Sequence, residues 1–176
     1  MTMIKAIIFV VVSAGFLRLS WSSLRRPTSY GFYRFFAFEA ILGLTLLNAD
    51  KWFVDPLSVL HAMSWLLLIG SLLLAIIGFR LLHVIGQPAG SIEDTTELVD
   101  VGVYRFIRHP LYASLMLFAL GVFFKDVSLL AGLLLAIAIA FMVATARFEE
   151  SENRETFGTA YAEYMKRSKM FIPYVF

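Results

Sequence analysis

Two runs of ionisable residues, each beside an apolar segment, could support chemistry in this chain. The first, RHPLY at 108–112, leads directly into an apolar segment. Proline suits the first turn of a helix, where free backbone N–H groups favour a carboxylate or phosphate. The second, RFEES at 147–151, follows a long apolar segment. Together the two runs supply guanidinium, imidazole and carboxylate groups, which are suited to holding a charged small molecule.

Whether the first run has a functional role depends on how deep it lies in the membrane. The apolar segment 111–124 is about 21 Å long as a helix, whereas a hydrocarbon core is about 30 Å thick. If this helix reaches the outer surface, Arg108 and His109 lie below the inner headgroups, where charges need partners or a watery cavity. The alternative is a thinned membrane with Arg108 snorkelling to the surface. For the second run, the alternative is a solvated helix that leaves the bilayer.

The composition is that of a membrane protein. The 176 residues are 60% hydrophobic and 16% charged, whereas soluble domains are about 45–50% apolar and about 25% charged. Soluble globules, disordered chains and nucleic-acid binders are therefore excluded, and the net charge of +2 is small. The chain has no cysteine, which excludes disulfides, thiolate metal sites and cysteine nucleophiles. The three histidines are too scattered for a metal centre.

The elements that must position both runs are membrane helices. We predict an all-α integral membrane protein with five transmembrane helices, the last two forming a tight hairpin, at 3–17, 32–47, 57–79, 111–124 and 127–146. Aromatic residues then recur at helical spacing as Phe157, Tyr161 and Tyr164. This pattern predicts a C-terminal amphipathic helix whose aromatic stripe anchors at the membrane surface.

The distribution of cations predicts the orientation. Placing the N-terminus outside and the C-terminus in the cytoplasm leaves only Lys5, Lys51 and Lys125 on the outer side. The first segment is interpreted as a retained anchor. The small size favours a bacterial inner membrane. By function, residues 1–85 form a scaffold of three spans, and residues 86–176 form the cofactor-binding catalytic half.

Three polar residues inside apolar segments need partners. Glu39 is predicted to pair with an arginine from another span, the alternative being that it lines a substrate route. His61 and His83 are predicted to be hydrogen-bonded packing residues.

An ordered set of motifs in the second half resembles one family. The set comprises LV at 98–99, GVY at 102–104, RHP-x-Y at 108–112, EE at 149–150, FG-x-x-Y-x-x-Y at 157–164 and FIP at 171–173. It is similar to that of the isoprenylcysteine carboxyl methyltransferases and related phospholipid methyltransferases, over about residues 86–176. The resemblance implies that S-adenosylmethionine binds at the cytoplasmic membrane face and that a lipophilic methyl acceptor enters from the bilayer.

The resemblance also assigns residues by position. Those expected to line the cofactor site are Thr96, Glu97, Leu98, Val99, Tyr104, His109, Pro110, Leu111, Tyr112 and Glu149. Arg108 and Glu150 are the expected catalytic residues: Arg108 would hold the cofactor carboxylate, and Glu150 would be the base if the acceptor is an amine or thiol. Thr145 and Arg147 are expected near the acceptor, and Thr145 stands where members acting on prenylated cysteine often carry arginine.

The predicted function is therefore a membrane S-adenosylmethionine-dependent methyltransferase with an isoprenylcysteine-type carboxylate as acceptor. Three alternatives stay open. A related enzyme would methylate nitrogen or sulfur in a phospholipid or small molecule. A sterol or steroid reductase would bind NADPH, whose phosphates require a more basic pocket. A small membrane subunit or assembly factor would have no catalytic role. The expected partners are the acceptor and membrane lipids, without nucleic acid or metal, and the oligomeric state is open.

Overall fold

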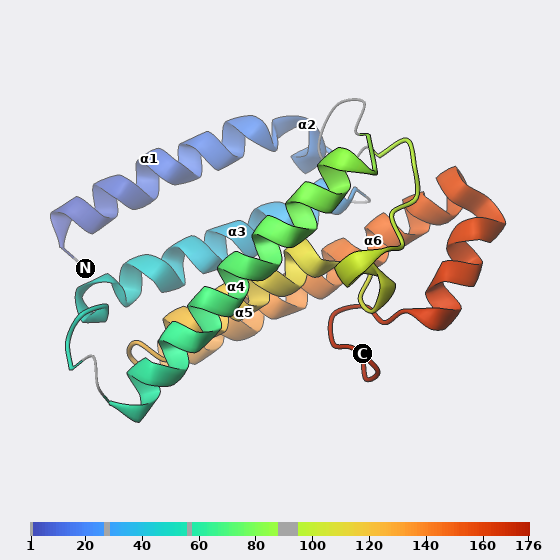
Figure 1. The fold of residues 1–176 in the computed structure, drawn as a ribbon. Coiled ribbons are helices and arrows are strands. Elements are labelled where there is room, and N and C mark those ends of the chain that lie inside the picture. The colour runs from blue at the N-terminus through green and yellow to red at the C-terminus, as the bar shows by residue number, and fades with distance from the viewer. Residues whose placement is uncertain (1, 27–28, 56–57, 88–94) are drawn as a thin grey trace. The chain divides into compact units, whose positions relative to one another are not determined.

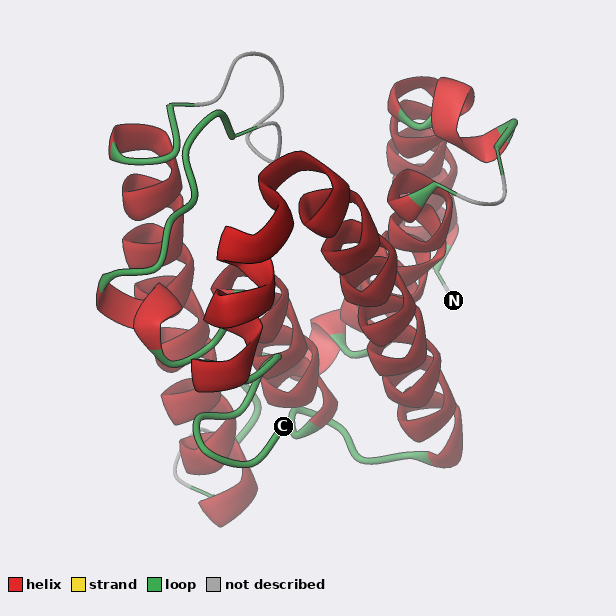
Figure 2. Ribbon diagram, turned by 90° about the vertical axis from the view of Figure 1, so that its right-hand side faces the viewer, coloured by secondary structure: helices red, strands yellow, loops and turns green. Residues whose placement is uncertain are grey.

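The regular elements of this protein are helices. The computed structural model describes residues 2–26, 29–55, 58–87 and 95–176, and within these ranges no strand occurs (Figure 2). The α-helices are α1 (Met3–Leu19), α2 (Trp21–Leu24), α3 (Tyr30–Leu47), α4 (Val59–Val84), α5 (Pro110–Phe123) and α6 (Leu129–Arg167). Two 3₁₀ turns, η1 (Ala49–Lys51) and η2 (Gly102–Arg105), interrupt the connections. The first residue of the predicted third span and part of the acidic loop, residues 88–94, lie outside the described residues.

Three described helices, α3, α4 and α6, are long and apolar enough to cross a membrane. Helix α4 leaves large apolar side chains such as Leu66, Leu72 and Phe79 exposed, as expected of a surface that faces lipid. The chain is therefore an all-helical integral membrane protein. Helix α1 has 17 residues and α5 has 14, so five spans with a terminal hairpin stay a prediction.

The chain divides into two compact units, and the boundaries between them fall within α4, α5 and α6. Unit 1 comprises residues 1–68 and 116–148, and unit 2 comprises residues 69–115 and 149–176. The predicted division into a scaffold and a catalytic half concerns function, and it stays a prediction.

Unit 1 is built around helices that approach closely through small residues. Helix α1 lies alongside α3 (Figure 1), and the Phe16 and Phe38 rings lie 5.7 Å apart. The Ser64 hydroxyl donates to the Gly121 carbonyl over 2.7 Å. A Cβ on Gly121 would lie 2.9 Å from Leu68 and 3.1 Å from the Ser64 carbonyl oxygen, so α4 and α5 meet where only glycine fits.

Of the polar residues inside unit 1, Glu39 differs from its prediction and His61 agrees with it. Glu39 accepts a 2.6 Å hydrogen bond from Ser13 on α1, so the prediction of an arginine partner was wrong. His61 is buried, and its ring nitrogens contact Ser58 Oγ at 2.9 Å and the Lys51 carbonyl at 3.0 Å. This confirms its packing role.

Lys125 is a buried cation in the turn between α5 and α6. Its residue is 3% exposed, and its Nζ lies 3.7 Å from the Trp65 ring centroid and 5.7 Å from that of Trp52. No hydrogen-bond acceptor for this ammonium lies among the described residues. The two indole faces are therefore its main electrostatic partners.

Unit 2 contains a sharp break within α6. Gly158 has φ 55° and ψ −128°, a conformation that side-chain-bearing residues avoid. The ribbon of α6 changes direction sharply toward its C-terminal end (Figure 1). The segment beyond Arg167 then pairs in parallel with the segment before α5, through a bridge between Ile107 and Lys169.

The fold-back buries two residues of the aromatic stripe within unit 2, whereas Phe157 is half-buried. Tyr161 is 3% and Tyr164 2% exposed, and Tyr164 donates its hydroxyl to the Tyr104 carbonyl over 2.6 Å. These two residues pack inside the protein, so their predicted role as membrane-surface anchors was wrong. His83 is exposed and stacks on Phe79 with ring centroids 6.3 Å apart, which differs from the predicted hydrogen-bonded packing.

Candidate active site

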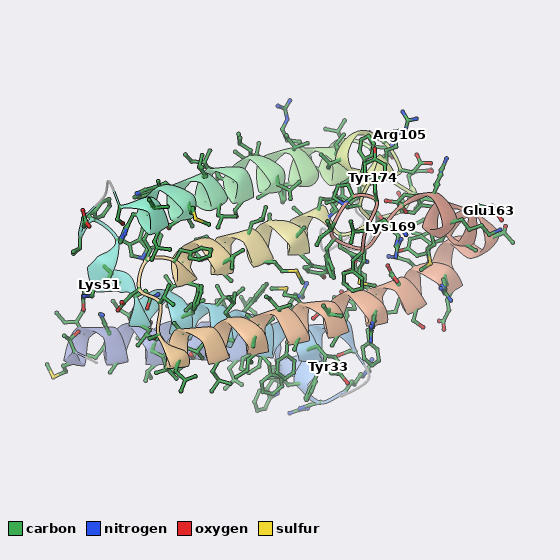
Figure 3. All side chains as sticks on the ribbon, turned by 90° about the horizontal axis from the view of Figure 1, so that it is seen from below. Tyr33, Lys51, Arg105, Glu163, Lys169 and Tyr174 are labelled. Atoms are coloured by element: carbon green, nitrogen blue, oxygen red, sulfur yellow. The ribbon has the colours of Figure 1, made fainter. Side chains whose placement is uncertain are left out.

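The backbone of the segment 106–109 is held by the returning C-terminal segment. Arg108 N–H donates to the Lys169 carbonyl over 2.8 Å, and His109 N–H donates to the Met170 carbonyl over 3.2 Å. Lys169 N–H in turn donates to the Phe106 carbonyl over 3.0 Å. In Figure 3, Lys169 lies beside the segment that carries Arg105. This pairing fixes the direction in which the Arg108 and His109 side chains leave the backbone.

Arg108 is bound on two sides. Its Nε donates to Glu150 Oε1 over 2.6 Å, and its Nη1 donates to the Ser168 carbonyl over 2.6 Å. The side chains of Arg108 and Glu150 are each only 9% exposed. The pair is therefore a largely buried salt bridge that ties α6 to the segment before α5 and to the C-terminal segment.

His109 lies between two consecutive carboxylates. Its Nε2 is 3.2 Å from Glu150 Oε1, and its Nδ1 is 3.8 Å from Glu149 Oε1. Successive helical residues point about 100° apart, so adjacent glutamates can flank one imidazole. The histidine side chain is 3% exposed. The two sequence runs singled out for chemistry therefore meet at this imidazole.

Glu149 is the most accessible member of this group. Its side chain is 18% exposed, about twice the fraction for Glu150. Tyr112 donates its hydroxyl to Glu149 Oε2 over 2.6 Å. The Tyr112 ring stacks on His109 with centroids 5.6 Å apart. A carboxylate partly open to solvent and bordered by an aromatic ring is suited to receiving a cation or hydroxyl groups.

Tyr104 has a different environment from the one predicted. It is 5% exposed, and its hydroxyl makes a long 3.4 Å hydrogen bond to the Gly78 carbonyl. Burial, together with the charge of Glu149, raises the pKa of the Tyr104 hydroxyl well above its usual value. Gly102, which starts this turn, has φ 59°, a backbone conformation that favours glycine.

The predicted cofactor-binding residues before this turn are anchored mainly by backbone contacts. Thr96 donates its hydroxyl to the Gln87 carbonyl over 3.0 Å, and its N–H donates to the Gly86 carbonyl over 2.9 Å. Glu97 is exposed, Leu98 is half-buried and Val99 is 5% exposed. Asp100, which follows them, is paired with Arg167 beyond the Gly158 break.

The remaining predicted site residues have separate environments. Pro110 is fully buried at the start of α5, and Leu111 is half-buried beside it. Thr145 and Arg147 belong to unit 1. Thr145 is fully buried and donates its hydroxyl to the Phe141 carbonyl of its own helix over 2.7 Å, whereas Arg147 is exposed.

Two residues of this site were not predicted. Ser168 contributes its carbonyl oxygen to Arg108, and a backbone acceptor leaves no mark in a sequence. Phe171 packs its ring 5.9 Å from that of His109 and is 7% exposed. The motif FIP at 171–173 was the available signal for Phe171, although it gave no partner. We call Arg108, His109, Tyr112, Glu149 and Glu150 the central cluster.

Comparisons with known proteins place this cluster within a shared region. Residues 59–160 match the family model for phospholipid methyltransferase, and all five residues of the central cluster lie inside that range. A curated relative, Protein-S-isoprenylcysteine O-methyltransferase B of Arabidopsis thaliana, is 27% identical over 84 residues. That match covers 47% of this chain and 43% of the relative, so the chain matches less than half the length of that protein.

Proposed function

Because the chain belongs to the phospholipid methyltransferase family, we propose that it is an S-adenosylmethionine-dependent methyltransferase that acts on a lipophilic acceptor. The observation that carries this proposal is the contact of His109 with both Glu149 and Glu150. It joins the two segments that the family resemblance assigns to the cofactor site.

The charge of the central cluster supports a cationic cofactor. Arg108 contributes one positive charge and the two glutamates contribute two negative charges, so these three side chains are together net negative. S-adenosylmethionine carries a sulfonium and an ammonium against one carboxylate, and this balance is complementary to the cluster. NADPH carries several phosphate charges that the same cluster would repel. The residues therefore fit S-adenosylmethionine and disfavour the reductase alternative.

Each residue of the cluster has a role that its contacts suggest. When bound, S-adenosylmethionine supplies an electrophilic methyl group. Glu149, the most accessible carboxylate, would accept hydrogen bonds from the ribose hydroxyls or the ammonium. Tyr112 orients Glu149 through its hydroxyl, and its ring is available to shield a cation. Alignment and exclusion of water supply most of the rate enhancement in such a transfer.

Arg108 and Glu150 act here as positioning residues. Arg108 Nε and Nη1 are already bonded to Glu150 and to the Ser168 carbonyl. The pair therefore holds His109 and α6 in place. This role differs from the expected one, in which Arg108 binds the cofactor carboxylate directly. Because Glu150 is engaged by both Arg108 and His109, it is a poor general base. This favours an acceptor that needs no proton removed.

We propose an isoprenylcysteine-type carboxylate as that acceptor. A carboxylate is already deprotonated at neutral pH, and the curated relative is named for O-methylation of isoprenylcysteine. The alternative acceptor is the amine of a phospholipid, which the family description favours. Thr145 and Arg147 are proposed to lie near the acceptor, as the family resemblance implies.

The membrane arrangement completes the proposal. Five spans, with the N-terminus outside and the C-terminus in the cytoplasm of a bacterial inner membrane, would place the central cluster at the cytoplasmic face. The acceptor would then enter from the bilayer, and membrane lipids would be further partners.

Calorimetry on the full chain in a neutral detergent tests the proposal. We expect saturable heat with S-adenosylmethionine and with its demethylated product, S-adenosylhomocysteine, and none with NADPH. Methyl transfer from labelled cofactor is then compared between a prenylated cysteine with a free carboxylate and phosphatidylethanolamine. Heat with NADPH alone would favour the reductase, and transfer only to the amine would replace the proposed acceptor.

A further inference from the structure

The N-terminal part of the chain carries an unbalanced positive charge. No acidic residue occurs before Glu39, whereas Arg18, Arg25 and Arg26 lie close together in the sequence. All three are exposed, and none forms an ion pair with a described residue. An anion from outside the chain is therefore the natural partner for this group.

These arginines border two neighbouring surface cavities around α2, which directly follows α1 (Figure 1). The first has a volume of about 420 Å³ and is lined by Trp21, Ser22, Ser23, Arg25, Arg26 and Ser29. The second has a volume of about 390 Å³ and is lined by Ala14, Leu17, Arg18 and Trp21. Trp21 borders both, so the two cavities adjoin at its side chain.

The two cavities differ in chemistry. The first offers two guanidinium groups and the hydroxyls of Ser22 and Ser23, which are donors that bind phosphate oxygens. The Ser29 hydroxyl already donates to the Ser23 and Arg26 carbonyls over 3.1 and 2.9 Å. The second begins at Ala14 and Leu17 on α1, which exposes further apolar side chains such as Ile7, Val10 and Val11. The pair thus runs from a phosphate-binding end to an apolar surface.

Trp21 is placed as an interfacial residue. It is 53% exposed, and the Arg25 guanidinium lies 5.1 Å from its ring centroid. Tryptophan prefers the boundary between hydrocarbon and headgroups. The cavity of Arg25 and Arg26 therefore lies at headgroup level if α1 lies in the hydrocarbon.

We propose that these two cavities bind one anionic phospholipid, with its phosphate at Arg25 and Arg26 and an acyl chain along Ala14 and Leu17. A basic pocket beside membrane helices is suited to such headgroups. The adjoining cavity, which Ala14, Leu17 and Trp21 line together with Arg18, would hold an acyl chain, which a free phosphate ion lacks. The residues that line the two cavities lie outside residues 59–160, which match the family, and outside the central cluster.

The test uses the full chain in a neutral detergent and native mass spectrometry to count bound lipid. The protein is mixed with dioleoylphosphatidylglycerol or with dioleoylphosphatidylcholine at equal concentration. The charge variant is Arg25→Gln/Arg26→Gln, and its control is Lys51→Gln/Arg80→Gln, which removes the same charge from exposed positions. Ala14→Trp fills the apolar cavity without changing the charge.

We expect phosphatidylglycerol to bind in preference to phosphatidylcholine. The charge variant should weaken that binding by about tenfold or more, because each of the two arginines that it removes contributes to the affinity for an anionic lipid. Ala14→Trp should also weaken it, and the control should leave it within about twofold. Equal binding of the two lipids, or unchanged binding by the charge variant, would overturn the proposal. Full displacement by glycerol 3-phosphate would also overturn it, by identifying a site for free phosphoesters. Melting temperatures of all variants check that each is folded.

Discussion

His109 Nδ1 lies 3.8 Å from Glu149 Oε1, although the two residues are far apart in the sequence. His109 precedes α5, whereas Glu149 lies within α6. The same imidazole is 3.2 Å from Glu150 through Nε2. Both carboxylates of the EE motif therefore contact one imidazole ring. Their different exposures indicate different roles. Glu149 faces outward enough to bind a ligand, whereas Glu150 is engaged in structure.

Glu149→Gln is expected to weaken cofactor binding with little effect on stability. Hydrogen bonds to a charged group contribute about 1.5–3 kcal/mol, so the Kd for S-adenosylhomocysteine should rise by about tenfold or more. Calorimetry measures this change. The matched control is Glu155→Gln, an exposed glutamate on the same helix, which should leave the Kd unchanged. Equal effects of the two substitutions would contradict direct binding by Glu149.

Arg108 and Glu150 should behave as a coupled pair in thermal unfolding. Removing one partner of a buried ion pair costs about 3–5 kcal/mol, because the other charge stays buried without compensation. Arg108→Leu and Glu150→Leu should each lower the melting temperature strongly. The double variant Arg108→Leu/Glu150→Leu should lose less than the sum of the single losses. Additive losses would show that the two residues act independently.

Gly158→Ala should destabilise unit 2 through backbone strain. Nothing lies within 4 Å of a Cβ at this position, so the cost comes from the positive φ and should be about 1–3 kcal/mol. Gly15→Ala is the matched control, because Gly15 lies within α1 and also has open space around it. That substitution should be neutral or stabilising by up to about 1 kcal/mol. If both substitutions changed the stability in the same direction, the argument from backbone conformation would be refuted.

Lys125→Met should stabilise the protein at neutral pH. The cation–π contacts with Trp65 and Trp52 contribute about 2 kcal/mol when desolvated, whereas burying an ammonium without a hydrogen bond costs more. A methionine of similar length removes this cost and keeps the packing on the indoles. The melting temperature measures the change, and a clear decrease would mean that the cation–π contacts dominate.

The same residue predicts a pH dependence. Burial lowers the pKa of the Lys125 ammonium below its usual value. Between that lowered pKa and about 10.4, the unfolded chain binds more protons than the folded one, so stability rises with pH. Lys125→Met should flatten this rise. Tyr104, whose pKa burial raises, has the opposite effect only above about pH 10. An unchanged pH profile in the variant would exclude Lys125 as its source.

The sequence predicted helices well where hydropathy dominates. The expected segment 111–124 corresponds to α5, and 3–17 to α1, within two residues. The end of α6 was predicted less well. In the sequence, Gly158 only slightly weakens a helical pattern. In the structure, its positive φ breaks the helix and the chain turns back. Periodicity reports which residues share a face, and it does not report what that face packs against.

The candidate site was predicted in part for a similar reason. The family resemblance assigned His109 and Glu149 to one site, and the structure brings their side chains to 3.8 Å. The bond from Arg108 to Glu150 was missed, since the local spacing made Arg147 the obvious partner. Tertiary structure overrode that preference and left Arg147 exposed.

The parallel pairing of Ile107 with Lys169 has a consequence for synthesis. During translation, Arg108 and His109 leave the ribosome well before the carbonyls of Ser168, Lys169 and Met170 exist to receive their hydrogen bonds. The membrane helices therefore insert before the backbone of Arg108 and His109 gains these partners. A nascent chain interrupted short of Ser168 is expected to be retained in the bilayer but to lack the proposed affinity for S-adenosylmethionine.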